Sequence, residues 1–191
     1  MNKQDYIIVL DLDDTIYPED DFRKSAILEI STLIERLYGI DKKKIIEICE
    51  QGGDIFCKIA EYIGYPSIKE SLIWQYRLHS PKNLPVYESS KFINTLLKNK
   101  ITTVILTDGL SITQRLKLES LNLLSLDFYI SDEFQSSKPD KLRFQIIEQK
   151  YNSNKYFYIA DNPKKDFYAP NQLGWNTILL KQNWKYIHSQ N

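Results

Sequence analysis

The sequence is poor in the residues that define several common classes of protein. Only two cysteines, six glycines and seven prolines occur among its 191 residues. Two thiols, Cys49 and Cys57, are too few for a disulfide framework and match no zinc-ligand spacing, so we expect free cysteines in a reducing compartment. The scarcity of glycine and proline, together with 42% hydrophobic residues, excludes a disordered, collagen-like or low-complexity chain.

The chain also lacks an excess of charge and any long apolar run. Lysine and arginine total 25, and aspartate and glutamate also total 25. Because proteins that bind nucleic acid are usually basic, we expect no nucleic-acid partner. The early run Tyr6–Leu10 is too short for a secretory signal, and no run reaches the roughly 18 apolar residues of a membrane span. We therefore expect a cytoplasmic protein with no membrane partner, and nothing in the sequence indicates its oligomeric state.

Short apolar runs recur along the chain and predict the strands of a parallel sheet. Continuous apolar runs of this length are typical of strands that are buried on both faces. Helical patterns at Ser111–Asn122 and Pro139–Tyr151 alternate with these runs, which predicts an α/β fold. The runs are Tyr6–Leu10, Thr102–Thr107, Phe128–Ile130, Tyr156–Ala160 and Thr177–Leu180.

Residues 17–80 follow a different pattern, in which apolar residues recur at helical spacing and no strand is evident. The pattern predicts helices from Phe22 to Leu37, from Asp41 to the Gly52-Gly53 turn, from Asp54 to Ile63, and up to Leu78 after a capping box formed by Ser67 and Glu70. We therefore predict an all-helical domain at residues 17–84, inserted into an α/β core of residues 1–16 and 85–191. Pro18 and residues 81–85 are its natural linkers.

Paired carboxylates follow the first predicted strand. Asp11 and Asp13 alternate on an extended backbone, which places both side chains on one face. Open α/β sheets bind their ligands at the carboxyl ends of the strands. Two carboxylates held together need a cation, and hard oxygen ligands favour Mg²⁺. Taken alone, the motif also fits an acidic turn after a strand, although the metal site is the favoured interpretation.

Three further motifs flank the later strands. Thr107-Asp108 ends a strand before a helix, an arrangement that can cradle an anion. Lys138-Pro139 precedes a predicted helix, and proline in the first helical turn would fix the lysine at the helix start. Asp161 and Asp166 follow the fourth run. Each of these motifs, taken alone, also fits a structural role as a turn, a solvated lysine or a helix cap.

The order of the four motifs resembles the haloacid dehalogenase (HAD) superfamily of aspartate-nucleophile phosphotransferases. The motifs span residues 11 to 166, and the helical block after the first motif resembles the C1 cap of that superfamily. The resemblance implies a Rossmann-like parallel sheet core with an inserted all-helical cap domain, and a hydrolase of the phosphatase type.

The resemblance also implies a role for each matching residue. Asp11 is the nucleophile that becomes an aspartyl phosphate, and Asp13 is the general acid and base. The phosphate is held by Thr107, the backbone amide of Asp108, and Lys138. The metal set is Asp11, Asp13 through its main-chain carbonyl, and Asp161, which together bind Mg²⁺. Thr15 and Asp166 support this arrangement.

Two details sharpen these expectations. As a general acid, Asp13 must carry a proton when the leaving oxygen departs, so we expect its surroundings to raise its pKa. Asp108 stands where asparagine is commoner in the superfamily, but the resemblance asks only its backbone to act. The dehalogenase branch lacks a second carboxylate like Asp13, so dehalogenation is not expected.

These motifs predict a Mg²⁺-dependent phosphatase acting on a small phosphorylated metabolite. A sugar phosphate is the first expectation and a nucleoside monophosphate, the substrate of a 5′-nucleotidase, is the second. The alternatives are a phosphoglucomutase-like phosphotransferase and a non-enzymatic scaffold that binds a metabolite. Within the cap, Tyr76, Arg77, His79 and the Gly52-Gly53 turn are candidate substrate contacts. Arg77 could instead be an ordinary surface arginine, and His79 could cap its helix.

Overall fold

The computed structural model describes residues 5–82 and 88–181. These residues divide into two compact units. One unit comprises residues 5–20 and 88–181, and the other comprises Asp21–Lys82. The predicted helical domain, 17–84, begins four residues before the second unit does. The predicted linkers at residues 83–85 lie outside the described residues.

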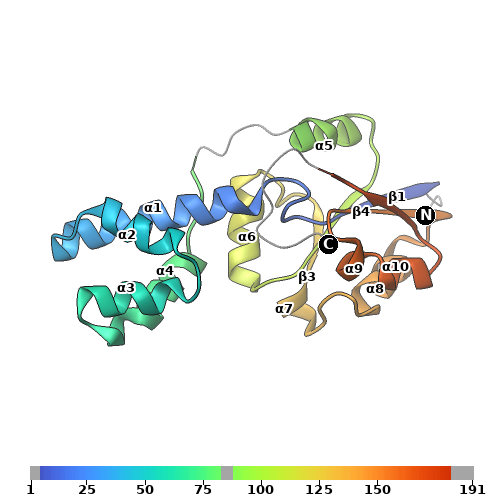
Figure 1. Cartoon of the computed structure of the whole chain (residues 1–191). Coiled ribbons are helices and arrows are strands. Elements are labelled where there is room, and N and C mark those ends of the chain that lie inside the picture. Colours follow the sequence, from blue (N-terminus) through green and yellow to red (C-terminus); the bar gives the residue numbers. More distant parts are fainter. Residues whose placement is uncertain (1–4, 83–87, 182–191) are drawn as a thin grey trace. The chain divides into compact units, whose positions relative to one another are not determined.

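The first unit contains a five-stranded parallel sheet (Figure 1). Its strands are β1 (Tyr6–Leu10), β2 (Thr103–Thr107), β3 (Asp127–Ile130), β4 (Lys155–Ala160) and β5 (Asn176–Leu179). The spatial order is β3-β2-β1-β4-β5, so β1 lies in the middle between β2 and β4. All five predicted strands are confirmed, and the order is that of a Rossmann-like fold.

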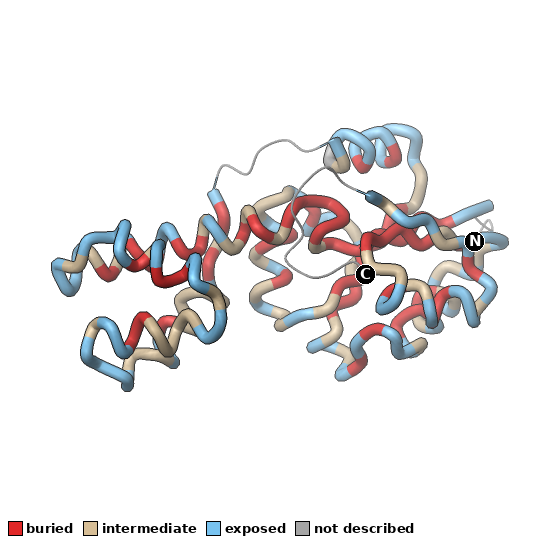
Figure 2. The backbone as a smooth tube through the Cα atoms, in the orientation of Figure 1, coloured by how far each residue is buried: buried red, intermediate tan, exposed pale blue. Residues whose placement is uncertain are grey.

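The sheet is buried because its strands are apolar on both faces. Every residue of β2 is buried, and in β1 only Tyr6 is exposed (Figure 2). Ile7 and Val9 contribute to one core, packed with Phe144, Ile147 and other side chains from the helices on that face. The register pairs Val9 with Val104 on one side and with Tyr158 on the other. This fixed register brings the ends of the central strands to one edge.

Helices flank the sheet, with α5 on one face and α8, α9 and α10 on the other (Figure 1). Helix α5 was not singled out from the sequence. The prediction that Pro139 opens a helix is wrong, because α8 begins three residues later and Asp140 accepts a hydrogen bond from the Leu142 amide at 2.8 Å. The helices are α5 (Glu88–Lys98), α6 (Ser111–Ser120), α7 (Ser131–Phe134), α8 (Leu142–Tyr151), α9 (Pro163–Asp166) and α10 (Tyr168–Gln172).

The second unit is entirely helical in its described residues. It contains most of α1 (Glu19–Tyr38), followed by α2 (Lys42–Glu50), α3 (Ile55–Ile63), a 3₁₀ turn (Pro66–Ile68) and α4 (Lys69–Arg77). The predicted helix starts at Asp41 and Asp54 are confirmed, since both residues are N-caps that accept hydrogen bonds from the amides of Lys43 and Cys57. Helix α3 ends at Ile63, as predicted, and Gly64 follows it as a C-cap in the left-handed conformation.

A helix start in the second unit was also predicted wrongly. The expected capping box of Ser67 and Glu70 does not form, because Pro66 starts a 3₁₀ turn that contains Ser67. Helix α4 follows this turn directly, with Ile68 at the N-cap and no side-chain cap. Local sequence favoured a capped helix, whereas the fixed φ of proline favoured the tighter turn.

The second unit has its own apolar core. Ile30 and Ile34 of α1, Ile45 and Cys49 of α2, and Ile59 of α3 are buried within it. Both cysteines are free, Cys49 buried and Cys57 half-buried, as predicted. No helix among the described residues is long and apolar enough to cross a membrane.

The helical core generates a stability prediction. Ile45 is fully buried, so Ile45→Ala should lower the free energy of unfolding by about 2–5 kcal/mol through lost apolar contacts and a residual cavity. Leu37→Ala is the matched control, since Leu37 is 62% exposed, and it should change stability by less than about 0.5 kcal/mol. Urea unfolding of both variants measures this. Equal losses of unfolding free energy in the two variants would contradict the burial of Ile45 in this core.

Candidate active site

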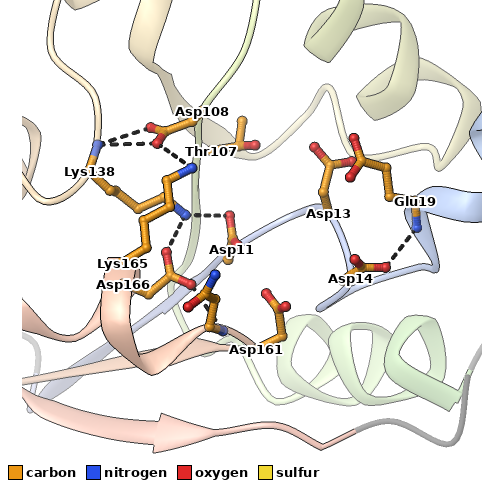
Figure 3. A pocket seen from close by; sticks show the side chains of 11 residues that line it. Asp11, Asp13, Asp14, Glu19, Thr107, Asp108, Lys138, Asp161, Lys165 and Asp166 are labelled. Atoms are coloured by element: carbon orange, nitrogen blue, oxygen red, sulfur yellow. Dashed lines mark hydrogen bonds and ion pairs between the residues drawn. The ribbon is translucent and has the colours of Figure 1, made fainter. Parts of the chain in front are cut away.

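The predicted motifs meet at the carboxyl edge of the sheet. Asp11 follows β1, Thr107 ends β2 and Asp161 follows β4, and these three strands are neighbours. Around them lies a cavity of about 130 Å³ (Figure 3). Its lining is almost wholly charged or polar: Asp11, Asp13, Asp14, Glu19, Thr107, Asp108, Lys138, Asp161, Asn162, Lys165 and Asp166.

Three carboxylates cluster in this cavity. Asp11, Asp161 and Asp166 are buried and offer oxygens that all lie within 4.8 Å of one another. The Thr15 hydroxyl donates to Asp161 Oδ1 at 3.3 Å, as its supporting position suggests. The side chain of Asp13 is not part of the cluster and lies toward Glu19 (Figure 3). Among the described side chains, Asp166 is therefore the third carboxylate of the group.

Lys138 is buried against the same carboxylates. Its Nζ lies 2.8 Å from Asp11 Oδ1 and 2.6 Å from Asp166 Oδ1, and it donates to the Tyr158 hydroxyl at 3.2 Å. The lysine is therefore held by side chains from β4, from the loop after β1 and from α9, and not by a helix start. Burial opposes its charge, but the neighbouring carboxylates raise the pKa of Lys138 well above its ordinary value.

The cluster carries more negative than positive charge. Burial, followed by the charge of Asp166, raises the pKa of Asp11 to about 8, although Lys138 opposes the shift. Burial and the charges of Asp166 and Asp14 raise the pKa of Asp161 to about 6. Three carboxylates share one buried lysine, so a further cation would relieve their repulsion. Carboxylate oxygens in this arrangement fit Mg²⁺.

Asp13 lies in different surroundings from those expected. Its Oδ1 accepts from the Tyr17 hydroxyl at 2.6 Å and pairs with Lys117 Nζ at 2.8 Å, and its Oδ2 accepts from Gln114 Nε2 at 2.9 Å. Burial raises the pKa of Asp13, but Lys117 and these hydrogen bonds outweigh burial and leave it below 3.8. The expectation of a raised pKa is therefore wrong for this arrangement, because sequence reasoning did not foresee the lysine.

Asp108 uses its side chain as well as its backbone. The carboxylate forms an ion pair with the fully buried Arg143, lies 2.9 Å from Lys165 Nζ, and accepts from the Lys138 amide. Arg143 also donates to the Thr107 carbonyl at 2.7 Å. Burial would raise the pKa of Asp108, but the charge of Lys138, followed by the contacts with Lys165 and Arg143, outweighs burial and lowers it. The view that only its backbone acts is therefore incomplete, because the carboxylate ties the loop after β2 to α8.

Several of these residues were missed in the sequence. Arg143, Gln114 and Lys117 are polar residues on the buried faces of α8 and α6. In α6 a signal was available, because Gln114 and Lys117 share the helical face of Leu118. Long polar side chains on an otherwise apolar face indicate buried partners elsewhere in the fold.

The candidate cap residues have contacts within the second unit. His79 is buried, and its ring nitrogens lie 2.7 Å from Glu29 Oε2 and 2.9 Å from Ser25 Oγ. Tyr76 packs edge-on against Phe22, and the Arg77 guanidinium lies over the Trp74 ring. Gly52 and Gly53 both adopt positive φ in the turn after α2. His79 thus links α1 to the residues that follow α4. These two hydrogen bonds account for the burial of His79 without a helix-capping role or a substrate contact.

Comparison with known proteins agrees with this architecture. The structure is similar to a HAD phosphatase from Thermococcus onnurineus, with 19% identity, a TM-score of 0.60 and coverage of 94% of this chain and 88% of that one. It is also similar to the HAD hydrolase YfnB of Bacillus subtilis bound to magnesium, with 18% identity, a TM-score of 0.65 and coverage of 96% and 90%.

A third similar structure is a 2-haloacid dehalogenase from Pseudomonas syringae, with 14% identity, a TM-score of 0.61 and coverage of 97% and 91%. At these identities the likeness concerns the fold. No curated protein matches the chain. Residues 8–180 match the model of a family described as haloacid dehalogenase-like hydrolase. The match covers most of the chain, including every motif at the sheet edge, and the chain therefore belongs to the haloacid dehalogenase-like hydrolases.

Proposed function

We propose that the protein is a Mg²⁺-dependent phosphatase that hydrolyses a small phosphomonoester through an aspartyl-phosphate intermediate. One observation carries the proposal. Asp11 ends the central strand inside a cavity where Lys138 and two further carboxylates lie beside it. This combination offers a nucleophile, a fixed positive charge and a set of oxygen ligands at one point.

The chemistry follows from the positions of the chain's own groups. A carboxylate oxygen of Asp11 attacks phosphorus, the bond from phosphorus to the substrate oxygen breaks, and that oxygen takes a proton from Asp13. Water then attacks the phosphorus of the aspartyl phosphate, Asp13 recovers a proton from that water, and Asp11 is released with inorganic phosphate. The surroundings of Asp13 in this structure lower its pKa, which suits the second step, where Asp13 accepts a proton. To act as the acid of the first step, Asp13 must first take up a proton.

Other groups hold the phosphoryl oxygens. Thr107 and the amide of Asp108 lie at the end of β2 on the cavity wall, where they can donate to those oxygens. Lys138 balances charge on Asp11 and on the transferring group. The metal would be held by Asp11, Asp161 and the Asp13 main-chain carbonyl, with Asp166 in support, and when bound Mg²⁺ neutralises negative charge on the phosphoryl group.

The presence of Asp13 favours a phosphomonoester over a haloacid, since an alkoxide that leaves phosphorus needs a proton donor. For the substrate, a sugar phosphate remains our first choice and a nucleoside monophosphate the second. A phosphoglucomutase-like phosphotransferase would use the same groups but exclude water and require a bisphosphate. A non-enzymatic scaffold would not need the complete set of reacting groups.

The nucleophile is tested by Asp11→Asn. The amide is nearly isosteric but a poor nucleophile, so turnover of p-nitrophenyl phosphate should fall more than about a hundredfold while the fold is retained. Steady-state kinetics and circular dichroism measure this. A folded variant that keeps more than about one hundredth of the wild-type kcat would rule out the covalent role.

The charge of the cluster predicts how pH changes stability without metal. Because the pKa values of Asp11 and Asp161 are raised to about 8 and about 6, the folded protein retains protons that the unfolded chain has released. This contribution is full below about pH 4 and is lost as pH rises through about 6 and 8. In EDTA, Tm should therefore fall as pH rises from about 5 to 8, and Mg²⁺ should raise Tm more at pH 8.

Thermal unfolding with and without EDTA across this pH range provides the measurement. Activity should also disappear in excess EDTA and return with Mg²⁺, while Ca²⁺ should inhibit because it favours more ligands than Mg²⁺. Full activity in excess EDTA would contradict the metal requirement.

We also propose that the helical unit, residues 21–82, selects the substrate. Arg77 is its test residue, because arginine makes bidentate contacts to anions. Arg77→Ala should greatly reduce kcat/KM on the best substrate from a panel of phosphometabolites and change it little on p-nitrophenyl phosphate. Equal losses on both substrates, or no loss on either, would remove Arg77 from substrate selection.

A further inference from the structure

Helix α6 contributes two buried polar side chains that the chemistry described so far leaves without a role. Gln114 and Lys117 are each only 3% exposed. They lie one helical turn apart on the face that also carries the buried Leu118. Burying an amide and an ammonium group is unfavourable unless each finds a strong partner. Both side chains reach the same carboxylate.

That carboxylate is Asp13, and it is held through both of its oxygens. Lys117 Nζ lies 2.8 Å from Oδ1, and Gln114 Nε2 donates to Oδ2 at 2.9 Å. The hydroxyl of Tyr17, four residues further along the chain, also donates a hydrogen bond to Oδ1, at 2.6 Å. A carboxylate with donors on both oxygens has a fixed rotation as well as a fixed position.

Gln114 also connects Asp13 to the turn after β2. Its Nε2 donates a second hydrogen bond to the Asp108 carbonyl at 2.7 Å. The side chain packs so closely over Gly109 that a Cβ there would lie 2.4 Å from Nε2. Gly109 has φ +145°, a conformation that other residues rarely adopt. Because Gly109 has no side chain, the amide of Gln114 can pack directly against the turn formed by residues 107–109.

The orientation of the Gln114 amide follows from these acceptors. Its Oε1 is buried without a hydrogen-bond partner among the described residues. Turning the amide over would place that oxygen against a carboxylate and a carbonyl, both of which are acceptors. The Gln114 amide therefore keeps both hydrogen bonds from Nε2, to the Asp13 carboxylate and the Asp108 carbonyl, and leaves Oε1 without a partner among the described residues.

We propose that Gln114 and Lys117 are positioning residues that fix the Asp13 carboxylate relative to the phosphate-binding turn, residues 107–109. The proposal rests on the proposed function, in which Asp13 gives a proton to the leaving oxygen. Proton transfer depends on distance and angle, so a carboxylate released from its donors remains present but delivers the proton poorly.

Leaving groups differ in how much they depend on this proton. p-Nitrophenolate is stable as an anion and departs without a donor, whereas phenolate depends on protonation more strongly. Loss of positioning should therefore reduce kcat/KM for phenyl phosphate more than for p-nitrophenyl phosphate. A general loss of structure would reduce both equally.

The experiment compares kcat/KM for these two substrates in the variants Gln114→Leu and Lys117→Met. Each variant is the full-length protein, assayed in the presence of Mg²⁺. Each variant should lose at least about tenfold more activity on phenyl phosphate than on p-nitrophenyl phosphate. Lys117→Arg keeps a cationic donor and should recover part of the difference. Arg115→Gln is the matched control on α6, because Arg115 is exposed and pairs with Glu133, and it should leave the ratio unchanged.

Equal losses on both substrates would overturn the proposal, whether or not Tm falls. If removal of the buried lysine prevents folding, Gln114→Leu decides the question, since it removes the hydrogen bonds without removing a charge. The proposed function is judged separately, on hydrolysis of either substrate by the unmodified protein. The wild type could hydrolyse the substrates while the variants keep its ratio of kcat/KM for phenyl phosphate to that for p-nitrophenyl phosphate. That result would contradict the positioning role and leave the proposed function standing.

Discussion

The site depends on one buried lysine between two carboxylates. Lys138 contacts Asp11 at 2.8 Å and Asp166 at 2.6 Å, and all three side chains are buried. Without the lysine the pKa of Asp11 would rise still further, and without the carboxylates the buried lysine could not remain charged. Asp161 adds a third buried carboxylate to the cluster, so the acidic groups outnumber the lysine. This excess of negative charge favours a divalent cation, which together with Lys138 would balance the charge of the phosphoryl group in the proposed reaction.

The fold supplies this arrangement through strand order. Since β1 lies between β2 and β4, the loops after all three strands open at one edge. The proposed nucleophile, Asp11, follows the central strand, the proposed phosphate-binding turn begins at the end of β2, and Asp161 and Asp166 follow β4. Helices α6 and α8 then secure the loops, α6 through the contacts of Gln114 and Lys117 with Asp13, and α8 through the ion pair of Arg143 with Asp108. The chemical groups lie on loops, but buried helical side chains restrict their movement.

The sequence was sufficient for the strands and for the edge where the motifs meet, because continuous apolar runs and strand-end carboxylates are local signals. It was insufficient for the surroundings of Asp13, whose partners Gln114 and Lys117 lie 101 and 104 residues away in the chain. The same limit applies to Lys138, which the local pattern assigned to a helix start and which tertiary ion pairs hold instead. The failed capping box at Ser67 has a local cause, since Pro66 favours a 3₁₀ turn.

The central claim is that Asp11 becomes covalently phosphorylated, and trapping that state tests it most directly. Asp13→Asn should accumulate the intermediate from p-nitrophenyl phosphate, because the leaving group departs without a proton while water is no longer activated. Acid quenching followed by peptide mass spectrometry locates the phosphoryl group. We predict one phosphoryl group, on Asp11, appearing together with a burst of p-nitrophenolate. A burst with the phosphoryl group on any other residue, or turnover by this variant with none on Asp11, would contradict the account.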